Sequence, residues 1–447
     1  MFTKCGANVL KSIVAKSLYL ILMMAFLFLI ESQVFAAAAL DNWSMFHHDL
    51  SHTGYSASTA PATSANLLWN YSTKNPIGAS PAIVDGYVYI SSDDGTVYKL
   101  NASDGSQVWT HTPLGRPAAI SSSIAVAEGY AYFGSYDRNV YCLNALTGNQ
   151  VWNFTTGNTV ESCPSVTNGY VYVGSWDGNI YCLDALTGNR IWNYTTGNIV
   201  ESSPAIRNGN VYVGSADNNI YCFDALTGSK IWNYTTGKLI MSSPAVVNDR
   251  VYIGSEDTNI YCLDASTGTK LWNYTTQGWV DSSPAVANGY VYIGSGVSDK
   301  PDKNIYCLNA SNGQKIWNYT TKDGVNSSPA VAGGYVYVGG WDNNVYCLNA
   351  SNGASEWTYT TQGHVSSSPA VSAGIVYIGS WDHQIYALGN PQTTPIQSSS
   401  NSPVANMFSL GQLVFPIAII IAVIVISGII LIVRHRKHEY LKQVNTV

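Results

Sequence analysis

The stretch LDALTGNRIWNYTTG, residues 183–197, returns almost unchanged as FDALTGSKIWNYTTG, residues 223–237. Aligning the chain on this phrase gives a series of tryptophans spaced 40 to 45 residues apart. Self-similarity at such a period is typical of propellers and solenoids, so this repeat decides the fold. The aligned residues are Trp109, Trp152, Trp192, Trp232, Trp272, Trp317 and Trp357.

Each unit of the repeat predicts four short antiparallel strands. In the unit that starts at Ser202, the apolar runs are SPAI, NVYVGS, NIYCFD and KIWNYTT. Turn-forming pairs such as Asn-Gly and Thr-Gly separate these runs, which are rich in Val, Ile, Tyr and Trp. The runs are almost continuously apolar, which indicates sheets covered on both faces, as in blades packed around an axis.

The chain contains eight such units, and the two ends of the series complement each other. The eighth unit ends before its tryptophan strand, whereas an extra copy of that strand, NLLWNYSTKN with Trp69, precedes the first unit. We therefore expect the N-terminal strand to complete the last blade, which removes an open sheet edge. A linear solenoid is the alternative, but it would need capping repeats at both ends, and none is visible. The predicted fold is all-β, an eight-bladed β-propeller of four-stranded antiparallel blades over residues 66–389.

Two hydrophobic segments flank the predicted propeller. Residues 17–30 are apolar, follow several lysines and precede small residues, as in a signal peptide. Residues 413–433 carry no charge and precede a basic stretch, which predicts a membrane-spanning helix with its C-terminus in the cytoplasm. We expect a single-pass protein of the cell membrane with the propeller outside. The expected order is signal peptide (1–38), lead-in segment (39–65), propeller (66–389), Ser/Thr/Pro-rich stalk (390–410), transmembrane helix (411–433) and basic cytoplasmic tail (434–447).

The charge of the chain excludes one class of partner. The formal net charge is −6, although cationic residues are concentrated at the two ends of the chain. The propeller is therefore acidic, and its sequence contains no basic stripe. Nucleic-acid binding requires such a basic surface, so we expect no nucleic-acid partner.

Six cysteines recur at one position of the repeat, each after a tyrosine. Equivalent positions of neighbouring blades are separated by the ~10 Å spacing of packed sheets, whereas a disulfide requires Cα atoms within about 7 Å. We therefore expect buried free thiols, and without CxxC pairs the sequence predicts no metal site. The six residues are Cys142, Cys182, Cys222, Cys262, Cys307 and Cys347.

The asparagine after most of the aligned tryptophans lies in an Asn-x-Thr sequon. On an exported protein such sequons are candidate N-glycosylation sites. The alternative is that the asparagine simply points outward beside an inward-facing tryptophan. The candidate residues are Asn153, Asn193, Asn233, Asn273 and Asn318.

The phrase LDALTGNRIW resembles the tryptophan-docking motif of the pyrroloquinoline-quinone-type (PQQ-like) propeller repeats, and Ala185, Gly188 and Trp192 carry it here. The resemblance implies that Trp69 and the seven aligned tryptophans each dock on a neighbouring blade, and that the glycine makes the turn. Residues 42–56, NWSMFHHDLSHTGYS, are also similar to the segment before the first blade in such proteins, including outer-membrane assembly factors. The implied fold is the propeller.

The same family includes quinoprotein dehydrogenases, which are similar in repeat only. These enzymes place a quinone on the axis with a calcium ion and an aspartate base. This chain contains no Cys-Cys pair, no CxxCH haem motif and no long insertion, and its repeats are nearly uniform. Because a catalytic centre usually breaks the pattern of one or two blades, we expect no enzyme and no cofactor.

Propeller topology sorts the loops onto two faces. With strands A to D in each blade, the variable face carries the B–C hairpins and the D–A connections, and the turn face carries the A–B and C–D turns. The hairpin aspartates are expected to serve the turns. Aromatic and acidic residues that the turns do not need predict a binding platform on the variable face, the alternative being rings that pack only on adjacent hairpins. The candidate residues are Tyr136, Trp176, Trp279, Trp341, Trp381, Glu161, Glu201, Asp281 and His364.

These features predict a monomeric, membrane-anchored extracellular propeller without catalytic activity. It would act as a binding or scaffolding module for a protein or for an envelope glycan. The alternatives are a quinone-dependent oxidoreductase and a surface sensor that signals through a partner.

Overall fold

The computed structural model describes residues 41–59, 64–113, 118–296 and 302–390. The predicted signal peptide, transmembrane helix and cytoplasmic tail, and the stalk beyond Asn390, lie outside these residues. Contacts divide the chain into residues 1–396 and 397–447, and the second unit also lies outside the described part. Within the described ranges, no helix is long and apolar enough to span a bilayer.

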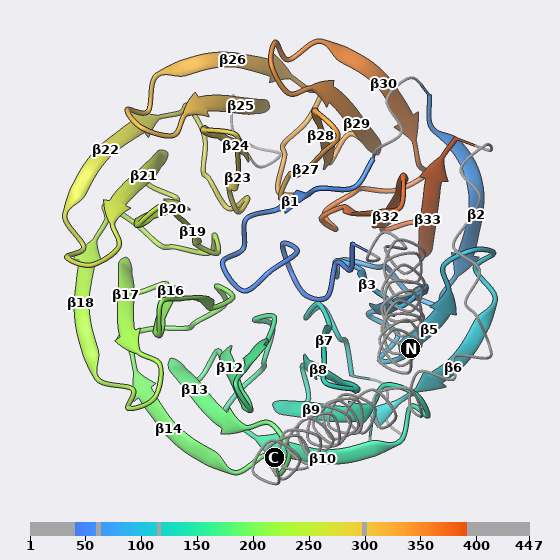
Figure 1. Cartoon of the computed structure of the whole chain (residues 1–447), viewed down its shortest axis with the longest axis vertical. Helices are drawn as coiled ribbons and strands as arrows, with labels where there is room; N and C mark the ends of the chain where they lie inside the picture. Colours follow the sequence, from blue (N-terminus) through green and yellow to red (C-terminus); the bar gives the residue numbers. More distant parts are fainter. Residues whose placement is uncertain (1–40, 60–63, 114–117, 297–301, 391–447) are drawn as a thin grey trace, which may run out of the picture. The chain divides into compact units, whose positions relative to one another are not determined.

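The described residues form eight antiparallel sheets arranged as the blades of a ring (Figure 1). The innermost strands are β3 (Ala82–Val84), β7 (Ala125–Ala127), β11 (Ser165–Thr167), β15 (Ala205–Arg207), β19 (Ala245–Val247), β23 (Ala285–Ala287), β27 (Ala330–Ala332) and β31 (Ala370–Ser372). The second strands are β4 (Tyr87–Ser91), β8 (Tyr130–Gly134), β12 (Tyr170–Gly174), β16 (Asn210–Gly214), β20 (Arg250–Gly254), β24 (Tyr290–Gly294), β28 (Tyr335–Gly339) and β32 (Ile375–Gly379).

The outer half of each blade contains a third strand and a rim strand. The third strands are β5 (Val97–Asn101), β9 (Asn139–Asn144), β13 (Asn179–Asp184), β17 (Asn219–Asp224), β21 (Asn259–Asp264), β25 (Asn304–Asn309), β29 (Asn344–Asn349) and β33 (Gln384–Gly389). The rim strands are β6 (Gln107–His111), β10 (Gln150–Thr155), β14 (Arg190–Thr195), β18 (Lys230–Thr235), β22 (Lys270–Thr275), β26 (Lys315–Thr320), β30 (Ser355–Thr360) and β2 (Asn66–Ser72). A further short strand, β1 (Tyr55–Ser56), pairs in parallel with β27.

The blade that begins at β15 shows why the repeat folds in this way. Asn208 and Gly209 have φ angles of 50° and 77°, which is the left-handed pair that a tight hairpin turn requires. Strands β16 and β17 are buried almost throughout, whereas the rim strand β18 alternates and buries Trp232. The continuous apolar runs therefore correspond to sheets covered on both faces, as predicted.

The ring closes between the first and last strands of the propeller. Strand β2 pairs with β33 in antiparallel register, with Trp69 opposite Ala387 and Tyr71 opposite Ile385. The last blade thereby gains its fourth strand, and neither end of the series leaves an open edge. This confirms the prediction of an eight-bladed propeller closed by its N-terminal strand.

The repeated tryptophans lock each blade to the next. Trp192, for example, donates its indole N–H to the carbonyl oxygen of Ala225 at 3.0 Å. The tryptophan of the preceding blade, Trp152, lies against Gly188, where an added Cβ would come within 2.7 Å of the indole ring. The motif glycine is therefore needed both for its φ of 72° and for the close approach of the ring. Equivalent indole bonds to alanine carbonyls join Trp69–Ala102, Trp109–Ala145, Trp152–Ala185, Trp232–Ala265, Trp272–Ala310 and Trp317–Ala350.

The six repeated cysteines are buried and free, as predicted. Burial raises the pKa of Cys222 to about 12, so this position acts as a small apolar residue. The first blade departs from the rule with Lys99, which is only 3% exposed. Its ammonium group donates to the carbonyl oxygen of Ala145 at 2.9 Å and lies 4.0 Å from the ring centre of Tyr87. Burial lowers the pKa of Lys99 to about 8.

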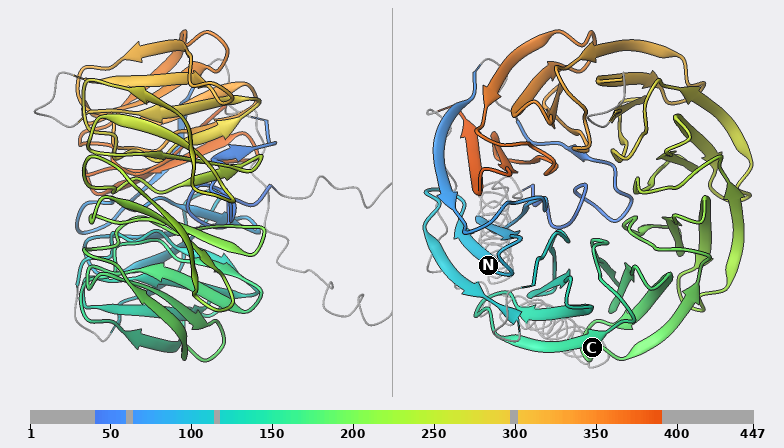
Figure 2. Two further views of the ribbon diagram at one scale, coloured as in Figure 1. Left: turned by 90° about the vertical axis from the view of Figure 1, so that its left-hand side faces the viewer. Right: turned by 180° about the vertical axis from the view of Figure 1, so that it is seen from behind.

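The lead-in segment crosses the axis of the propeller (Figures 1 and 2). Asn42 is hydrogen-bonded to Asp85 in an A–B turn, and the carbonyl of Asp41 accepts from Ser372, the last residue of β31 before the next such turn. The segment therefore lies at the turn face. The middle residue of six innermost strands donates its N–H to a carbonyl of this segment. These donor–acceptor pairs are Ile83–Trp43 (2.8 Å), Val126–Ser44 (2.8 Å), Ile206–Leu50 (2.6 Å), Val246–Ser51 (2.8 Å), Val286–Thr53 (2.8 Å) and Val331–Gly54 (2.7 Å). The segment therefore satisfies the free edges of the innermost strands.

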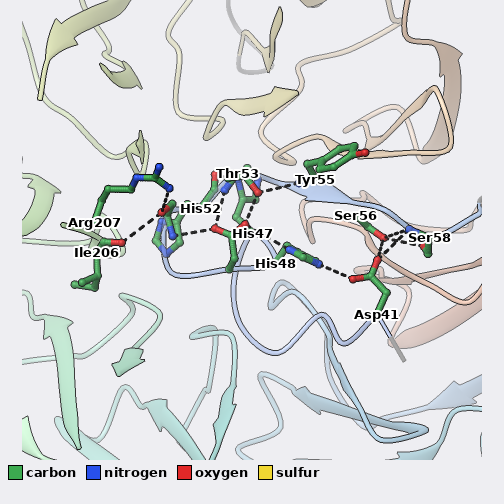
Figure 3. A network of polar contacts seen from close by, with 12 residues as sticks. Asp41, His47, His48, His52, Thr53, Tyr55, Ser56, Ser58, Ile206 and Arg207 are labelled. Atoms are coloured by element: carbon green, nitrogen blue, oxygen red, sulfur yellow. Dashed lines mark hydrogen bonds and ion pairs between the residues drawn. The ribbon is translucent and has the colours of Figure 1, made fainter. Parts of the chain in front are cut away.

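Polar side chains hold the lead-in segment in its shape (Figure 3). The ring nitrogens of His48 lie 3.2 Å from Asp41 and 3.5 Å from Asp49. Burial disfavours the charged imidazole, but the two carboxylates outweigh it and raise the pKa of His48. Thr53 donates to the carboxylate of Asp49, and Ser56 donates to that of Asp41.

Candidate functional site

A cavity of about 500 Å³ occupies the axis between the lead-in segment and the variable face. Two rings of residues line it, with one residue per blade in each ring. The residues of the variable ring are Gly78, Ser121, Glu161, Glu201, Met241, Asp281, Asn326 and Ser366. The residues of the serine ring are Ser80, Ser123, Cys163, Ser203, Ser243, Ser283, Ser328 and Ser368. Phe46 of the lead-in segment also lines the cavity, together with Asp93, Tyr136, Trp341 and Trp381.

The serine ring is a closed circle of hydrogen bonds. Each backbone N–H in it donates to the side chain at the same position in the next blade, over 2.9 to 3.2 Å. Seven acceptors are hydroxyl oxygens, and the eighth is the thiol of Cys163. The ring fixes the innermost ends of all eight blades and therefore the positions of the variable ring beside it.

The variable ring is acidic on one side. Glu161, Glu201 and Asp281 come from three of four consecutive blades, and Met241 lies between the last two. Burial raises the pKa of Glu201 to about 8, and repulsion by Glu161, Asp281 and Glu256 adds to this effect. Burial and the charge of Glu256 likewise raise the pKa of Asp281 to about 7.

Buried polar atoms at this side of the cavity lack partners. The Oε1 atom of Glu161 accepts a hydrogen bond of 2.9 Å from the hydroxyl of Tyr136. The Oε2 atom of Glu161 and the Oδ1 atom of Asp281 are buried without a hydrogen-bond partner among the described residues. Unpaired buried carboxylate oxygens are costly, so these atoms are available to a ligand.

Aromatic side chains surround the mouth of the cavity in two groups. Tyr136 and Trp176 have ring centres 6.3 Å apart. The ring centre of His364 lies 5.8 Å from that of Trp341 and 5.7 Å from that of Trp381. The rings thus pack on adjacent hairpins, yet Trp381 remains 45% exposed and donates its indole N–H to Ser366.

The structure brings most of the predicted site residues together. Tyr136, Glu161, Glu201, Asp281, Trp341 and Trp381 line the cavity. Trp176 and His364 contact rings of this group. Trp279 is half-buried and does not line the cavity, and its carbonyl oxygen accepts the N–H of Gly296.

The hairpin aspartates serve the turns, as the sequence predicts. Asp177 accepts the backbone N–H of Asn179 at 2.9 Å and the hydroxyl of Tyr181 at 2.7 Å. It also accepts the N–H of Gly157 in the preceding D–A connection, and so joins two blades. The blade with the longest hairpin uses Asp302 in the same way, since this carboxylate accepts from Tyr306 and from the N–H of Gln277.

The candidate glycosylation sites lie on the rim strands. The side-chain amide of Asn193 donates to that of Asn179 on the neighbouring strand at 2.9 Å, and Asn233, Asn273 and Asn318 make the same contact. These asparagines are exposed. Their modification stays a prediction.

Several residues of the cavity could not be recognised from the sequence. Phe46 belongs to a segment without repeats, so nothing in its spacing indicates that it reaches the axis. Asp93 precedes Asp94, the aspartate of this hairpin that the sequence assigns to the turn, yet Asp93 lines the cavity, and burial raises its pKa. The signal that could have found Asp93 is the first aspartate in SDDGT, because the other hairpins have no aspartate at that position.

Solved structures with the same fold include an assembly factor and an enzyme. BamB from Moraxella catarrhalis is 21% identical, with a TM-score of 0.63 over 73% of this chain and 98% of that chain. A europium-containing methanol dehydrogenase is 14% identical, with a TM-score of 0.69 over 78% of this chain and 98% of that chain. At these identities the likeness establishes the propeller fold alone.

A curated relative corrects one expectation from the sequence. A quinohemoprotein alcohol dehydrogenase of Comamonas testosteroni is 29% identical over 83 residues, which span 17% of this chain and 12% of that protein. The uniform repeat predicts that the chain is not an enzyme. This prediction is wrong, because proteins similar to the chain in sequence and in fold include dehydrogenases. Uniform blades are therefore no criterion for the absence of catalysis.

The cavity can be tested against the quinone that such enzymes carry. Pyrroloquinoline quinone is a polycarboxylate and needs cationic partners. The described residues that line the cavity include four carboxylates and no lysine or arginine. This donor set does not fit an anionic quinone, and we derive no chemical step through one.

The family of the chain follows from its sequence. The family model of the outer membrane protein assembly factor BamB matches residues 58–153, 237–300 and 301–393, more than half of the chain. The match includes the closing strand β2 and most of the blades, in agreement with the geometry above. The chain belongs to the BamB family of outer membrane protein assembly factors.

Proposed function

We propose that the chain is a protein-binding scaffold that engages its partner with the variable face. The observation that carries this proposal is the asymmetry of the axis. The lead-in segment covers the turn-face end, whereas the cavity is bordered at the variable face by the exposed rings of Tyr136 and Trp381. Exposed aromatic residues around a concave site are typical of protein-binding surfaces.

The family supports a scaffolding role, since it is a family of outer membrane protein assembly factors. A rigid ring suits such a role. The serine ring and the docking tryptophans hold the hairpins of all eight blades in fixed positions, so a partner would meet a preformed surface.

We also propose that residues 411–433 anchor the scaffold in a membrane with the propeller outside. The uncharged apolar stretch and the basic residues after it support this proposal. Alkaline extraction of membranes tests it. The full-length chain should stay in the pellet, and a variant without residues 411–433 should be released; release of both would contradict the proposal.

Site-specific photo-crosslinking tests the binding face. A photoreactive amino acid is introduced at Trp381 on the variable face or, as a control, at Thr227 on the turn face, which is also exposed. We expect a discrete protein adduct from position 381 alone. An adduct with envelope polysaccharide instead would assign the face to a glycan, and equal adducts from both positions would contradict the proposal.

A further inference from the structure

We infer that the axial cavity binds a primary alkylammonium group, supplied either by a free polyamine or by a lysine side chain of the partner. Binding of a free polyamine is independent of the proposed function. Binding of a partner's lysine rests on that function and specifies which chemical group of the partner is recognised. The chain contains many acidic residues, but only here do they border a cavity with buried oxygen atoms that lack partners within the described residues.

The charge around the cavity has one sign. Asp93, Glu161, Glu201 and Asp281 line it, and Glu256 lies close enough to Glu201 and Asp281 to raise the pKa of both. No cationic side chain of the described residues lines the cavity to neutralise this charge. A buried cluster of carboxylates without counter-charge is unfavourable, and a bound cation would relieve it.

The geometry favours an extended organic cation over a bare metal ion. In the described part of the chain, no three metal-ligating side chains converge as a metal site requires. The carboxylates are instead distributed over several blades around a space of about 500 Å³. An ammonium group has three N–H donors, and the unpaired oxygens Oε2 of Glu161 and Oδ1 of Asp281 offer acceptors for them on two different blades.

The opposite side of the cavity suits the rest of such a ligand. Trp341 and Trp381 line this side, and the variable ring there is neutral, with Asn326 and Ser366. The indole faces can cover the methylene groups next to an ammonium and also attract its charge. The indole N–H of Trp341 is buried without a partner among the described residues, so a carbonyl of the ligand can accept from it.

Protonation controls this binding. The titratable groups that face the carboxylates of the variable ring are the other acids, the hydroxyl of Tyr136 and the thiol of Cys163, and no described basic residue lines the cavity with them. Glu201 and Asp281 are partly protonated near neutral pH, since their pKa values are about 8 and about 7. A cation stabilises the ionised forms, so binding at pH 7 should release protons, and the affinity should rise with pH. The titratable groups concerned are Asp93, Glu161, Glu201, Glu256, Asp281, Tyr136 and Cys163.

Isothermal titration calorimetry of the full-length chain tests the inference with two probes, spermidine and an acetylated peptide with a single lysine. Binding of spermidine alone assigns the cavity to free polyamines, and binding of the peptide alone assigns it to a partner's lysine. At pH 7 the heat should depend on the ionisation enthalpy of the buffer, because protons are released. Asp281→Asn and Glu201→Gln should each weaken binding about tenfold or more at pH 8.5.

Matched variants separate this effect from folding. Glu128→Gln removes an exposed carboxylate on the turn face and should leave the affinity unchanged. Met241→Lys places a tethered ammonium between Glu201 and Asp281 in the variable ring and should block both probes, whereas Met241→Leu should not. Failure of both probes to bind, binding that weakens as the pH rises, or equal affinity in all variants would overturn the inference. None of these results depends on the crosslinking experiment, so the two proposals fail separately.

Discussion

Ser368 donates its backbone N–H to the hydroxyl of Ser80 at 3.0 Å, across 288 residues of sequence. This bond joins the last blade to the first and completes the serine ring. The same contact recurs between every pair of neighbouring blades, so closure at the axis uses the same interaction as the rest of the ring. Closure at the rim, where β2 pairs with β33 and Trp69 lies opposite Ala387, is a second and separate connection between the two ends of the propeller.

The serine ring should contribute measurably to stability. Ser203→Ala removes the acceptor of the Cys163 N–H, which is buried. We expect a loss of about 1–3 kcal/mol in the free energy of unfolding, because a buried donor is left unpaired. Cys163→Ser is the control, since it replaces the thiol acceptor by a hydroxyl and should cost less than about 0.5 kcal/mol. Denaturant unfolding measures both, and an equal loss in the two variants would contradict the role of the ring.

The closing strand should be as important as any internal blade. Trp69→Ala and Trp232→Ala each remove a docked indole that is 8% exposed, and each should cost about 3–5 kcal/mol. Trp381→Ala truncates an indole that is 45% exposed, so it should change the stability by less than about 0.5 kcal/mol. Unfolding curves of the three variants check this. A Trp69→Ala protein as stable as the parent would show that closure at the rim is dispensable.

The acidic side of the cavity should make the fold less stable as the pH rises. Burial and neighbouring carboxylates raise the pKa of Glu201 to about 8 and that of Asp281 to about 7, whereas free carboxyl groups titrate near about 4. The folded state therefore holds more protons, and the free energy of unfolding falls as the pH rises from about 4 to about 8. Melting temperatures at pH 5.5 and 8.5 should differ less in Glu201→Gln than in the parent, while Glu128→Gln should keep the parental difference.

The lead-in segment should have the opposite pH dependence. Burial lowers the pKa of His47 to about 3 and that of His52 to about 4, against about 6.5 in the unfolded chain. The folded state holds fewer protons, so this contribution is present above about pH 6.5 and is lost as the pH falls toward 3–4. His47→Asn keeps a residue that tolerates its φ of 56° and should flatten the acid side of the stability profile. His383→Asn, at an exposed hairpin position with φ of 70°, should leave that side unchanged.

Features set by the period of the repeat could be predicted from the sequence. The number of blades, the docking of Trp192, the free thiol of Cys222 and the pairing of Trp69 with the last blade each follow from aligning identical phrases. Such features recur in each blade, and a recurring pattern has few physical solutions. The turn role of Asp302 could not be predicted in this way, because the insertion before it shifts the alignment. Its carboxylate nevertheless accepts the tyrosine hydroxyl of its blade, as the other hairpin aspartates do.

The site itself was only partly predictable. The acidic and aromatic residues could be assigned to one face from topology, but the cavity depends on the side chains of eight blades at once. Phe46, His47 and His52 lie in a segment without periodicity, and their positions follow from hydrogen bonds to strands far away in sequence. The enzyme question could not be decided from uniform blades either, since similar proteins include dehydrogenases.

The bond from Val331 to Gly54 has a consequence for biogenesis. Residues 43–54 leave the ribosome before any blade exists, yet their partners are distributed from the first blade to the seventh. The residues of the propeller that are synthesised first are therefore among the last to reach their final positions, after nearly the whole ring has been translated. Until then the nascent protein exposes unpaired inner edges, which are the surfaces that chaperones recognise.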